Sequence, residues 1–358
     1  MNGVVYDEHN LPSSQHSKMY LVNTTSDFQL GDVIHVHIVL CDAYNKPLTR
    51  GGDLVLVWMS DPNKGASSSG SVIDHVNGSY TGILRALWTG RAVIKFAISC
   101  SSEGFAMMYQ YFSKQGASKN ILCIFEAMKI REVTVGSTTV DHGNGNICNL
   151  TAENYGIPWF CGKPKNRPPI TECTQLQLTL LFDKIWNDTK WHRRSAAYKK
   201  AFNYELIWTR HGLPIYFGEI NRGETRPVFV SLDGIPPGSN DILLIHLYAH
   251  FQYHHPKIFR INIRRTVTSL KELLARSPNV SVAIKGPHYF SFRDRRTLGG
   301  MWGPIYTHIL KEEFKELYQK VWFLDVWDMT VAQESRDVHP SSSIVKSMVN
   351  MFVDFVCS

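Results

Sequence analysis

The sequence lacks metal-binding cysteine patterns, nucleic-acid-binding motifs and long apolar runs. Its seven cysteines form no CxxC pair and no Cys/His spacing of the kind that binds zinc, so no metal site is expected. No DNA- or RNA-binding motif accompanies the net charge of +7, so a nucleic-acid partner is not expected. No stretch reaches the roughly 18 uninterrupted apolar residues that a membrane span requires. Disulfides remain as the expected role of the cysteines, and the odd count leaves one thiol over.

The first residues, MNGVVYDEHNLPSS, also lack the basic and apolar regions of a signal peptide. The chain nevertheless contains five Asn-X-Ser/Thr sequons, which are acceptors for N-glycosylation in the secretory pathway. They begin at Asn23, Asn77, Asn149, Asn187 and Asn279. We therefore predict a disulfide-containing glycoprotein that is secreted or resides in the Golgi lumen, and whose natural N-terminus precedes this chain.

The composition is that of an ordinary folded protein. With 44% hydrophobic and 19% charged residues, a chain of 358 residues suffices for two domains. The positive charge is concentrated between Lys257 and Arg296, where ten basic residues accompany two acidic ones. Such a segment could attract an anionic ligand such as a sialylated glycan or a phosphate. It could equally form the solvated face of a helix with a basic loop, and both interpretations stay open at this point.

Residues 16–130 are expected to form an antiparallel β domain. In VIHVHIVLCD the apolar residues recur with a period of two, so one strand face holds Ile34, Val36, Ile38 and Leu40. Further alternating segments follow, separated by Asn-Gly and Thr-Gly turn signals. Short strands at near-regular spacing are typical of an immunoglobulin-like sandwich. His35 and His37 share the other face of the first strand and, without a third ligand, are assigned to an exposed surface.

Residues 204–358 follow a different pattern, in which apolar runs alternate with helical periodicity. DILLIHLYAHF is typical of a strand covered on both faces, and residues 256–276 then show apolar side chains at helical spacing. Two further strand–helix pairs follow, and the last helix has an apolar stripe of Ile344, Met348, Met351, Phe352 and Phe355. This order predicts an α/β domain with a parallel sheet. Residues 131–203, rich in cysteine and proline, are expected to be a disulfide-stapled linker and a divergent segment.

The segment Asp337–Pro340, DVHP, lies between the last predicted strand and the last helix. Sites in parallel α/β folds lie beyond the carboxyl ends of strands, so this segment falls where a site is expected. A histidine with an aspartate two residues before it is typical of the acid–base end of a hydrolase or acyltransferase. His339 is therefore the candidate general base, and Asp337 is its nearest acidic partner.

The segments described above resemble a known family. GDVIHVHIVLCDAYNKPLTRGGDLVLVWM and DHVNGSYTGILRALWTGRAVIKF are similar to the neurexophilin-type sandwich domain. LYAHFQYHHPKIFRINIRRTVTSLKELLARSPNVSVAIKG and FLDVWDMTVAQESRDVHP resemble the C-terminal part of the PC-esterase domain. This pairing is the signature of the neurexophilin and PC-esterase domain (NXPE) family, and the resemblance covers residues 18–165 and about 204–358.

The resemblance implies a secretory-pathway glycoprotein whose second domain has an SGNH/GDSL hydrolase fold, and some members are associated with O-acetylation of sialic acid. It also implies a serine nucleophile in a Gly-Asp-Ser turn, a C-terminal histidine that takes its proton, and an acid that orients the histidine. Here the histidine is His339. The acid is expected three residues earlier, where Arg336 stands, so Asp337 is a loose match, and Asp325 and Asp328 are the alternatives.

The Gly-Asp-Ser motif itself is absent from the sequence, and only residues 167–204 stand where a much longer segment is expected. Ser195 has neither Gly nor Asp before it and is a poor substitute. Gly238–Asp241 precedes its strand and is expected to be a turn. His250, at the end of a predicted strand, is a candidate substrate or oxyanion contact, with a structural role as the alternative. The α/β domain is thus expected to be incomplete, and TQLQLTLLF is a segment that could fill the place of the lost strand.

Three functions stay open on these residues, and enzymatic activity is undecided among them. The chain can be a divergent member with an impaired acyl-transfer site that acts by binding. It can be an active O-acyltransferase or esterase with an unidentified nucleophile, in which case acetyl-CoA is the expected donor; no other cofactor is expected. It can also be an adhesion protein that binds a receptor through its β domain. A sialylated or other glycan is the expected ligand of the first two.

Overall fold

The computed structural model divides into two compact units, each of which is discontinuous in the sequence. The first unit comprises Met1–Tyr109, Lys285–Pro304 and Phe323–Ser358, and the second comprises Gln110–Ile284 and Ile305–Trp322. The first unit therefore combines most of the predicted β domain with parts of the predicted α/β domain. The structure describes residues 7, 9, 11–22, 27–115, 121–139, 146–165, 173, 176–181, 195–200, 204–209, 226–290 and 300–357.

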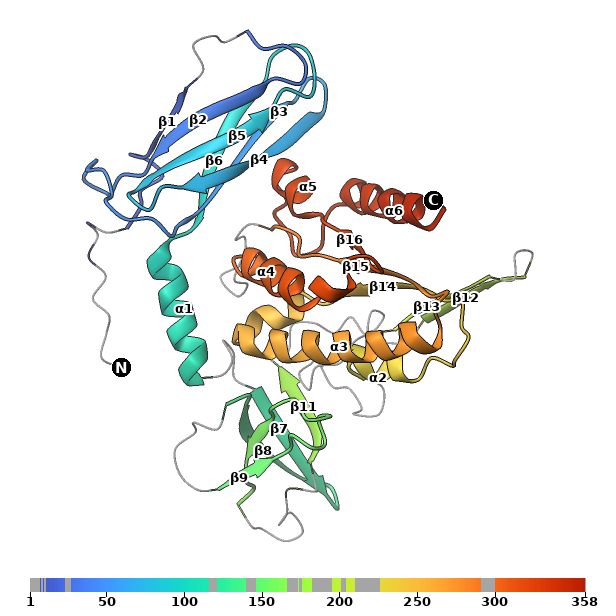
Figure 1. The fold of residues 1–358 in the computed structure, drawn as a ribbon. Helices are drawn as coiled ribbons and strands as arrows, with labels where there is room; N and C mark the ends of the chain where they lie inside the picture. The colour runs from blue at the N-terminus through green and yellow to red at the C-terminus, as the bar shows by residue number, and fades with distance from the viewer. Residues whose placement is uncertain are drawn as a thin grey trace. The chain divides into compact units, whose positions relative to one another are not determined.

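Six antiparallel strands form the β domain of the first unit (Figure 1). They are β1 (Lys18–Leu21), β2 (Val33–Val39), β3 (Leu54–Asp61), β4 (Ala66–Asp74), β5 (Ser79–Arg85) and β6 (Val93–Cys100), in the order β1-β2-β5-β4-β3-β6. The predicted antiparallel β domain is confirmed. In place of the two separate sheets of an immunoglobulin-like sandwich, the strands form one curled sheet, because β4 changes partner along its length. Its residues 66–70 pair with β3, whereas residues 71–74 pair with β5.

The curled sheet encloses the core that the alternation in β2 predicts. The buried residues of this face are Ile34, Val36, Ile38 and Leu40. Opposite strands complete the core with Val55, Val57, Met59, Tyr80 and Leu84. His35 and His37, on the other face of β2, are partly exposed. Within the described ranges, no group of three or more His, Cys, Asp or Glu side chains is arranged to hold a metal ion.

Gly82 of β5 lies where side chains of β2 and β3 meet in this core. A Cβ atom at this position would lie 2.6 Å from the side chain of Val36 and 3.1 Å from that of Val57. We expect Gly82→Ala to lower the free energy of unfolding by about 1–3 kcal/mol, because a buried valine must move. Gly234→Ala is the control, since its Cβ would meet the nearest atom at 3.6 Å. Equal urea midpoints for the two variants would contradict this expectation.

A buried ion pair joins the start of β3 to the helix α1 (Ser102–Gln115), which the sequence patterns did not predict. The side chain of Asp53 is fully buried. It accepts hydrogen bonds from Arg50 Nη1 at 2.6 Å, from the Tyr80 hydroxyl at 2.9 Å and from the backbone N–H of Ser102 at 3.0 Å. Arg50 also donates to a carboxylate in the first turn of α1 at 2.6 Å. The network therefore holds the start of α1 against the β domain.

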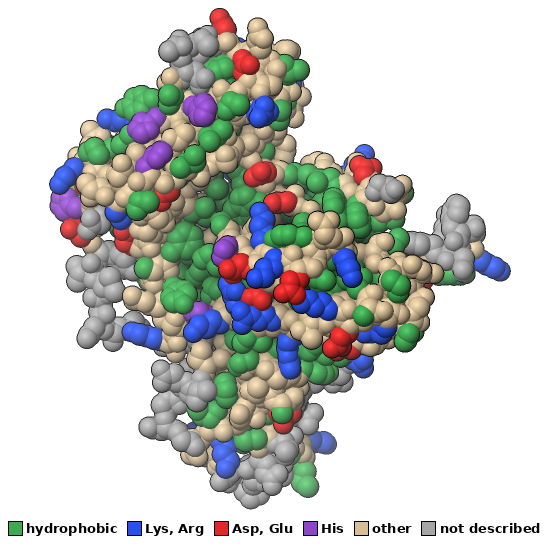
Figure 2. Space-filling view, in the orientation of Figure 1, with side chains coloured by type: hydrophobic (Ala, Val, Ile, Leu, Met, Phe, Trp, Pro, Cys, Tyr) green, Lys and Arg blue, Asp and Glu red, His purple; other side chains and the backbone are tan. Residues whose placement is uncertain are grey.

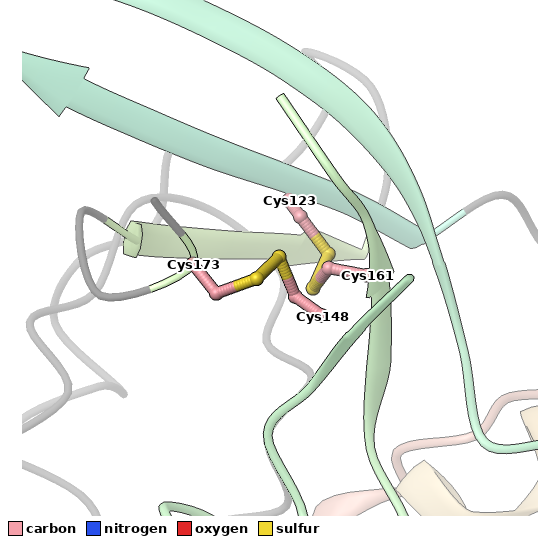
Figure 3. Close-up of a disulfide and its surroundings, with 4 residues drawn as sticks. All are labelled: Cys123, Cys148, Cys161 and Cys173. Carbon is pink, nitrogen blue, oxygen red and sulfur yellow. A yellow bond between two sulfur atoms is a disulfide. The ribbon is translucent and has the colours of Figure 1, made fainter. Parts of the chain in front are cut away.

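The second unit contains a five-stranded antiparallel sheet with two disulfides (Figure 3). Its strands are β7 (Ile121–Ala127), β8 (Ile130–Ser137), β9 (Ile147–Asn149), β10 (Phe160–Gly162) and β11 (Leu176–Leu181), in the order β11-β7-β8-β10-β9. The disulfides join Cys123 to Cys161 and Cys148 to Cys173, which confirms the predicted role of the cysteines. Three thiols remain free instead of one: Cys41, Cys100 and Cys357.

β9, β10, β11 and nearly all of β8 lie within residues 131–203, where the sequence predicts a disulfide-stapled linker and a divergent segment. The predicted boundary at residue 130 falls on the first residue of β8, inside the β7–β8 hairpin. The segment TQLQLTLLF contains β11, which pairs antiparallel with β7. The expectation that it fills a position in the parallel sheet is therefore wrong. A separate two-stranded sheet follows, formed by β12 (Ser195–Lys199) and β13 (Tyr204–Trp208).

The α/β region has a small parallel sheet in the order β14-β15-β16, which confirms the predicted architecture at this level. The strands are β14 (Ile242–His246), β15 (Ser281–Lys285) and β16 (Trp322–Leu324). The helices are α2 (Val228–Asp233), α3 (Pro256–Arg276), α4 (Gly303–Glu313), α5 (Trp327–Ala332) and α6 (Ser342–Cys357), with short 3₁₀ helices η6 (Ala249–Tyr253) and η7 (Lys315–Leu317). No helix in the described residues is long and apolar enough to cross a membrane.

The termini of α3 follow local signals. His255 is its N-cap, and the ring Nδ1 accepts the backbone N–H of Lys257 at 3.1 Å. Pro256 occupies the first helical position, where its missing N–H has no cost. At the other end the backbone N–H of Ser277 donates to the carbonyl of Leu273 at 2.8 Å. The predicted limits of this helix are confirmed.

Two apolar segments are less covered than the sequence patterns suggest. Ile242 and Leu244 of β14 are each 45% exposed, so the prediction of a strand covered on both faces is wrong for one face. In α6, Ile344 and Met348 are buried, whereas the other members of the predicted stripe are partly exposed. A run of apolar residues shows that burial is favourable but does not show how much neighbouring chain is present to provide it.

Candidate functional site

Residues 335–340, here called the His339 loop, connect α5 to α6 in the first unit. Asp337 and His339 are both exposed on this loop. The Asp337 carboxylate accepts the backbone N–H of His339 at 3.0 Å, in the manner of an Asx turn. The structure thus brings the two predicted residues together, but through the main chain of His339. The acid nearest to the candidate base holds the shape of the loop.

A second histidine, which the sequence patterns did not single out, hydrogen-bonds to the main chain of the His339 loop. His288 is buried, three residues after the end of β15, and its Nε2 lies 2.8 Å from the carbonyl oxygen of Val338. Because a carbonyl only accepts, Nε2 carries the proton and donates. The other ring nitrogen, Nδ1, then serves as an acceptor and lies 3.5 Å from Nζ of Lys285. The contact could not be predicted from the sequence, because 50 residues separate His288 from Val338.

Burial dominates the electrostatics of these two groups. Burial, together with the nearby charge of Lys285, lowers the pKa of His288 to about 3, so the imidazole is neutral at physiological pH. Burial also lowers the pKa of Lys285 to about 8. At pH 7 about a tenth of this amine is therefore unprotonated. His339 thus supplies an exposed imidazole, His288 a buried neutral imidazole, and Lys285 an amine that is mostly protonated. Groups of these kinds can bind a polar ligand and accept a proton.

Glu334 ties the start of the His339 loop to the β domain within the same unit. Its Oε1 accepts the indole N–H of Trp58 at 3.0 Å and an N–H of the Lys95 ammonium at 2.6 Å. The hydrogen bonds from Lys95 and Trp58 hold the pKa of the Glu334 carboxyl below its usual value. The residue has φ of +49°, a left-handed conformation that ends α5. Next to it, Gln333 donates to the hydroxyl of Ser67 at 2.7 Å.

The two alternative acids lie at the start of α5. Asp325 is exposed and accepts the backbone N–H of Trp327 at 3.2 Å, so it shapes the turn before the helix. Asp328 is exposed in the first turn of α5, where a negative charge favours the helix dipole. Both positions have a local role in starting α5.

His250 belongs to the second unit and lies exposed in η6, after the carboxyl end of β14. Its predicted position at the end of a strand is therefore correct, while its contact with a substrate stays a prediction. Four residues later, His254 is fully buried, and neither ring nitrogen has a hydrogen-bond partner among the described residues. Burial, together with the charge of His250, lowers the pKa of His254 to about 3. The amide of the buried Gln252 is likewise unpaired there.

The two buried histidines predict that the fold loses stability in acid. Both pKa values lie below about 6.5, the value in the unfolded chain, so unfolding takes up protons as the pH falls through 6.5. The stabilisation is fully present above that pH, and about 2 kcal/mol per histidine is lost at pH 5. Urea unfolding at pH 7.5 and pH 5 measures the difference.

The matched variant for this experiment is His288→Gln, whose amide nitrogen can reach the position of Nε2 and still donate to the carbonyl of Val338, but does not titrate. We expect the variant to lose about 2 kcal/mol less than the parent chain between the two pH values. An equal loss in both proteins would show that His288 is not responsible for the acid sensitivity.

The two other candidate segments lie in the second unit. Gly238 has φ of +78°, and the hydroxyl of Ser239 donates to the carbonyl of Pro236 at 2.9 Å, which supports the predicted turn at 238–241. Ser195 is the first residue of β12 and pairs with Trp208 of β13. Among the described residues around them, neither segment forms a strand–turn–helix of the kind that presents a nucleophilic serine.

Two family models match the chain and together span it almost completely. The model described as Neurexophilin matches residues 8–200, and the model described as NXPE family member 4-like, C-terminal domain, matches residues 172–357. Each covers more than half of the 358 residues. The chain belongs to the NXPE family. The curled β domain lies within the first match, and the His339 loop of this NXPE-family chain lies within the second.

Three of the five sequons of the NXPE-family chain lie on described residues, and all three are exposed: Asn77, Asn149 and Asn279. The side-chain oxygen of Asn77 accepts both the backbone N–H and the hydroxyl of Ser79, at 3.0 and 2.7 Å. That of Asn149 accepts the backbone N–H of Thr151 at 3.0 Å. Exposed turns of this kind leave the amide nitrogen accessible to a glycan. Asn23 and Asn187 lie outside the described residues.

Three basic residues of this segment of the NXPE-family chain, Arg260, Arg264 and Lys271, form ion pairs with acids. Arg260 of α3 donates to Glu312 at 2.8 Å and to Glu313 at 2.7 Å, and Arg264 donates to Glu313 at 3.0 Å. Figure 2 shows blue and red side chains interleaved over α3 and α4. These contacts favour the interpretation as a solvated helix face. The arginines at the end of the segment lie outside the described residues.

Proposed function

We propose that this chain is a secretory-pathway glycoprotein that acts by binding, with an acyl-transfer site too impaired for efficient turnover. The observation that carries the proposal is that the sequence contains no Gly-Asp-Ser nucleophile motif. The Asp337 carboxylate, nearest to the candidate base, accepts the backbone N–H of His339 and so shapes the loop. An acyl-transfer site without its nucleophile retains only about 10³–10⁴ of rate enhancement over water.

The test is turnover by the purified full chain. Acetyl-CoA with a sialylated glycan probes transfer, and an aryl acetate ester probes hydrolysis. We expect rates equal to those of the His339→Ala variant. The control is His308→Ala, which removes an exposed imidazole on α4 in the other unit. Turnover that disappears in His339→Ala but persists in His308→Ala would establish an active enzyme and overturn the proposal.

The secretory part of the proposal rests on the two disulfides and the exposed sequons. Expression of the chain behind a signal peptide should give a protein whose mass falls after treatment with a peptide N-glycosidase. Replacing Asn77, Asn149 and Asn279 by Gln should remove most of that shift. An unglycosylated native protein with reduced cysteines would contradict this part alone.

A second function, adhesion through the β domain, is favoured by the edge of the curled sheet. β1 is the edge strand, and its end exposes three consecutive apolar residues, Tyr20, Leu21 and Val22. Edge strands with exposed apolar residues are prone to pair with other chains. Binding of the full chain to cell-surface protein should then be lost in Val22→Lys and kept in Val93→Lys, which alters the opposite edge strand β6.

A further inference from the structure

The side of the β domain that points away from its core carries histidines and cations, and we call it the outer face. Figure 2 shows histidine side chains gathered on this domain. The strand register gives the members of the face, because the side chains of directly paired residues lie on the same side of a sheet. They are Lys18 and Tyr20 of β1, Val33, His35, His37 and Val39 of β2, Ser79, Thr81, Ile83 and Arg85 of β5, and Ser71 and Ile73 of β4. None of these described positions is an aspartate or a glutamate.

Two histidines from separate segments meet at Thr81. His37 is the cross-strand partner of Thr81, and neighbouring strands lie about 4.8 Å apart. His75, in the connection between β4 and β5, has its Nε2 2.8 Å from the hydroxyl oxygen of the same Thr81. His75 is exposed and His37 is partly exposed. Two imidazoles and a hydroxyl group are thus available to one ligand at this point of the surface.

Positive charge extends to both ends of the outer face. Lys18 is paired with Val39 and Arg85 with Val33, so the two cations lie at opposite ends of β2. Both side chains are exposed. The guanidinium of Arg85 donates one hydrogen bond, to the carbonyl of Gly31 at 2.8 Å, and keeps its charge. His35 and His37 lie between these ends.

The two acids that flank the strands of this face have other contacts. Asp74 is paired with the buried Tyr80, so it points to the other side of the sheet, where its carboxylate accepts the backbone N–H of Gly52 at 2.6 Å. Asp32, which precedes β2, accepts the backbone N–H of Gln29 at 2.7 Å. The outer face therefore presents cationic and protonatable side chains to an approaching ligand, which favours an anionic one.

We propose that the outer face binds a sulfated polysaccharide, and that it binds this ligand more tightly as the pH falls. Histidines take up protons between about pH 8 and pH 5, so acidification adds positive charge between Lys18 and Arg85. Sulfate oxygens accept hydrogen bonds from imidazolium, guanidinium and ammonium groups. Tyr20, the partner of His37 on β1, offers an aromatic ring to the C–H face of a sugar.

The spacing of the charges favours a densely charged chain. β2 has seven residues, so Lys18 and Arg85 lie about 20 Å apart, which exceeds the size of a single small anion. His37 and His75 are close to one strand spacing apart, and groups so close suit a polymer with several sulfates on neighbouring sugars. A polysaccharide with one carboxylate on every second sugar would meet them one at a time. The proposed function uses the edge of β1 and the His339 loop, and it assigns no ligand to this face.

The test is heparin binding by the purified full chain, measured by isothermal titration calorimetry at pH 6 and pH 8 in about 0.15 M salt. We expect the affinity to be about tenfold higher at pH 6, since each of two newly charged pairs on the surface contributes about threefold. The double variant His37→Gln/His75→Gln should lose this difference, because glutamine stays polar but does not titrate. The matched control is His308→Gln, which removes an exposed imidazole on α4 and should keep the difference.

Each other outcome overturns the proposal. One is the absence of heparin binding at pH 6. Another is a pH dependence that is equal in the double variant and in His308→Gln, since the titrating groups would then lie elsewhere. The third is binding of poly-glutamate, or of vesicles that contain phosphatidylserine, as tight as that of heparin and lost in the double variant. The face would then bind an acidic protein or a membrane. Circular dichroism at both pH values confirms that each variant is folded.

Discussion

The double variant Cys161→Ala/Cys173→Ala should unfold at a much lower urea concentration than the parent chain. Each substitution breaks one disulfide of the five-stranded sheet, whose core contains both bonds together with Phe125 and Trp159. The bonded cysteines are 38 and 25 residues apart, and chain-entropy estimates for loops of these lengths are about 4 and 3.5 kcal/mol. The two loops overlap in sequence, so their sum is an upper bound for the pair.

Urea unfolding of the full chain, followed by hydrogen exchange of peptides from β7 to β10, measures this loss and localises it. Cys357→Ala is the matched control, because that thiol is free and exposed at the end of α6. We expect the control to unfold like the parent chain. Unchanged exchange in β7–β10 of the double variant would mean that the disulfides do not stabilise this sheet.

Arg50→Ala should be the most damaging single substitution in the β domain. It removes the cation from Asp53, whose side chain has no exposed surface, and leaves that carboxylate with the Tyr80 hydroxyl and one backbone N–H. Removing one partner of a buried ion pair costs about 3–5 kcal/mol. Because the Arg50 side chain is 27% exposed, we expect a value of about 3 kcal/mol.

Urea unfolding again measures the effect, and Arg85→Ala is the control. Arg85 is exposed and donates to the carbonyl of Gly31 at 2.8 Å, so its loss should cost less than about 1 kcal/mol. The double variant Arg50→Ala/Asp53→Asn should regain part of the loss, because it no longer buries an unpaired charge. A loss no greater than that of Arg85→Ala would contradict the importance of the pair.

Local sequence signals predicted the structural features that depend on residues close together in the chain. Pro256 and Ser277 mark the two ends of α3 because capping involves residues within one turn. The alternation in β2 predicted its buried face because successive side chains of a strand point to opposite sides. The disulfide role of the cysteines was predictable from spacing that suits no metal, but the pairing was not.

The candidate site was predictable only in part, because its contacts join distant segments. DVHP was recognisable, yet His288 contacts Val338 from 50 residues away, and no periodicity reveals such a pairing. Asp337 was recognisable as the acid nearest to His339, but its hydrogen bond to the backbone N–H of His339 became visible only in the structure. Similarly, the alternation in β11 indicates a strand but not which sheet contains it.

The contact between Glu334 and Trp58 has a consequence for the order in which the chain is made. These residues are 276 positions apart, so a ribosome adding about 5–20 residues per second needs about 14–55 s to go from one to the other. During that interval the face of β3 that carries Leu56 and Trp58 has emerged, but α5, which covers it, has not yet been synthesised. A nascent chain should therefore expose this apolar face until α5 has been translated, and a product terminated before α5 would keep it uncovered.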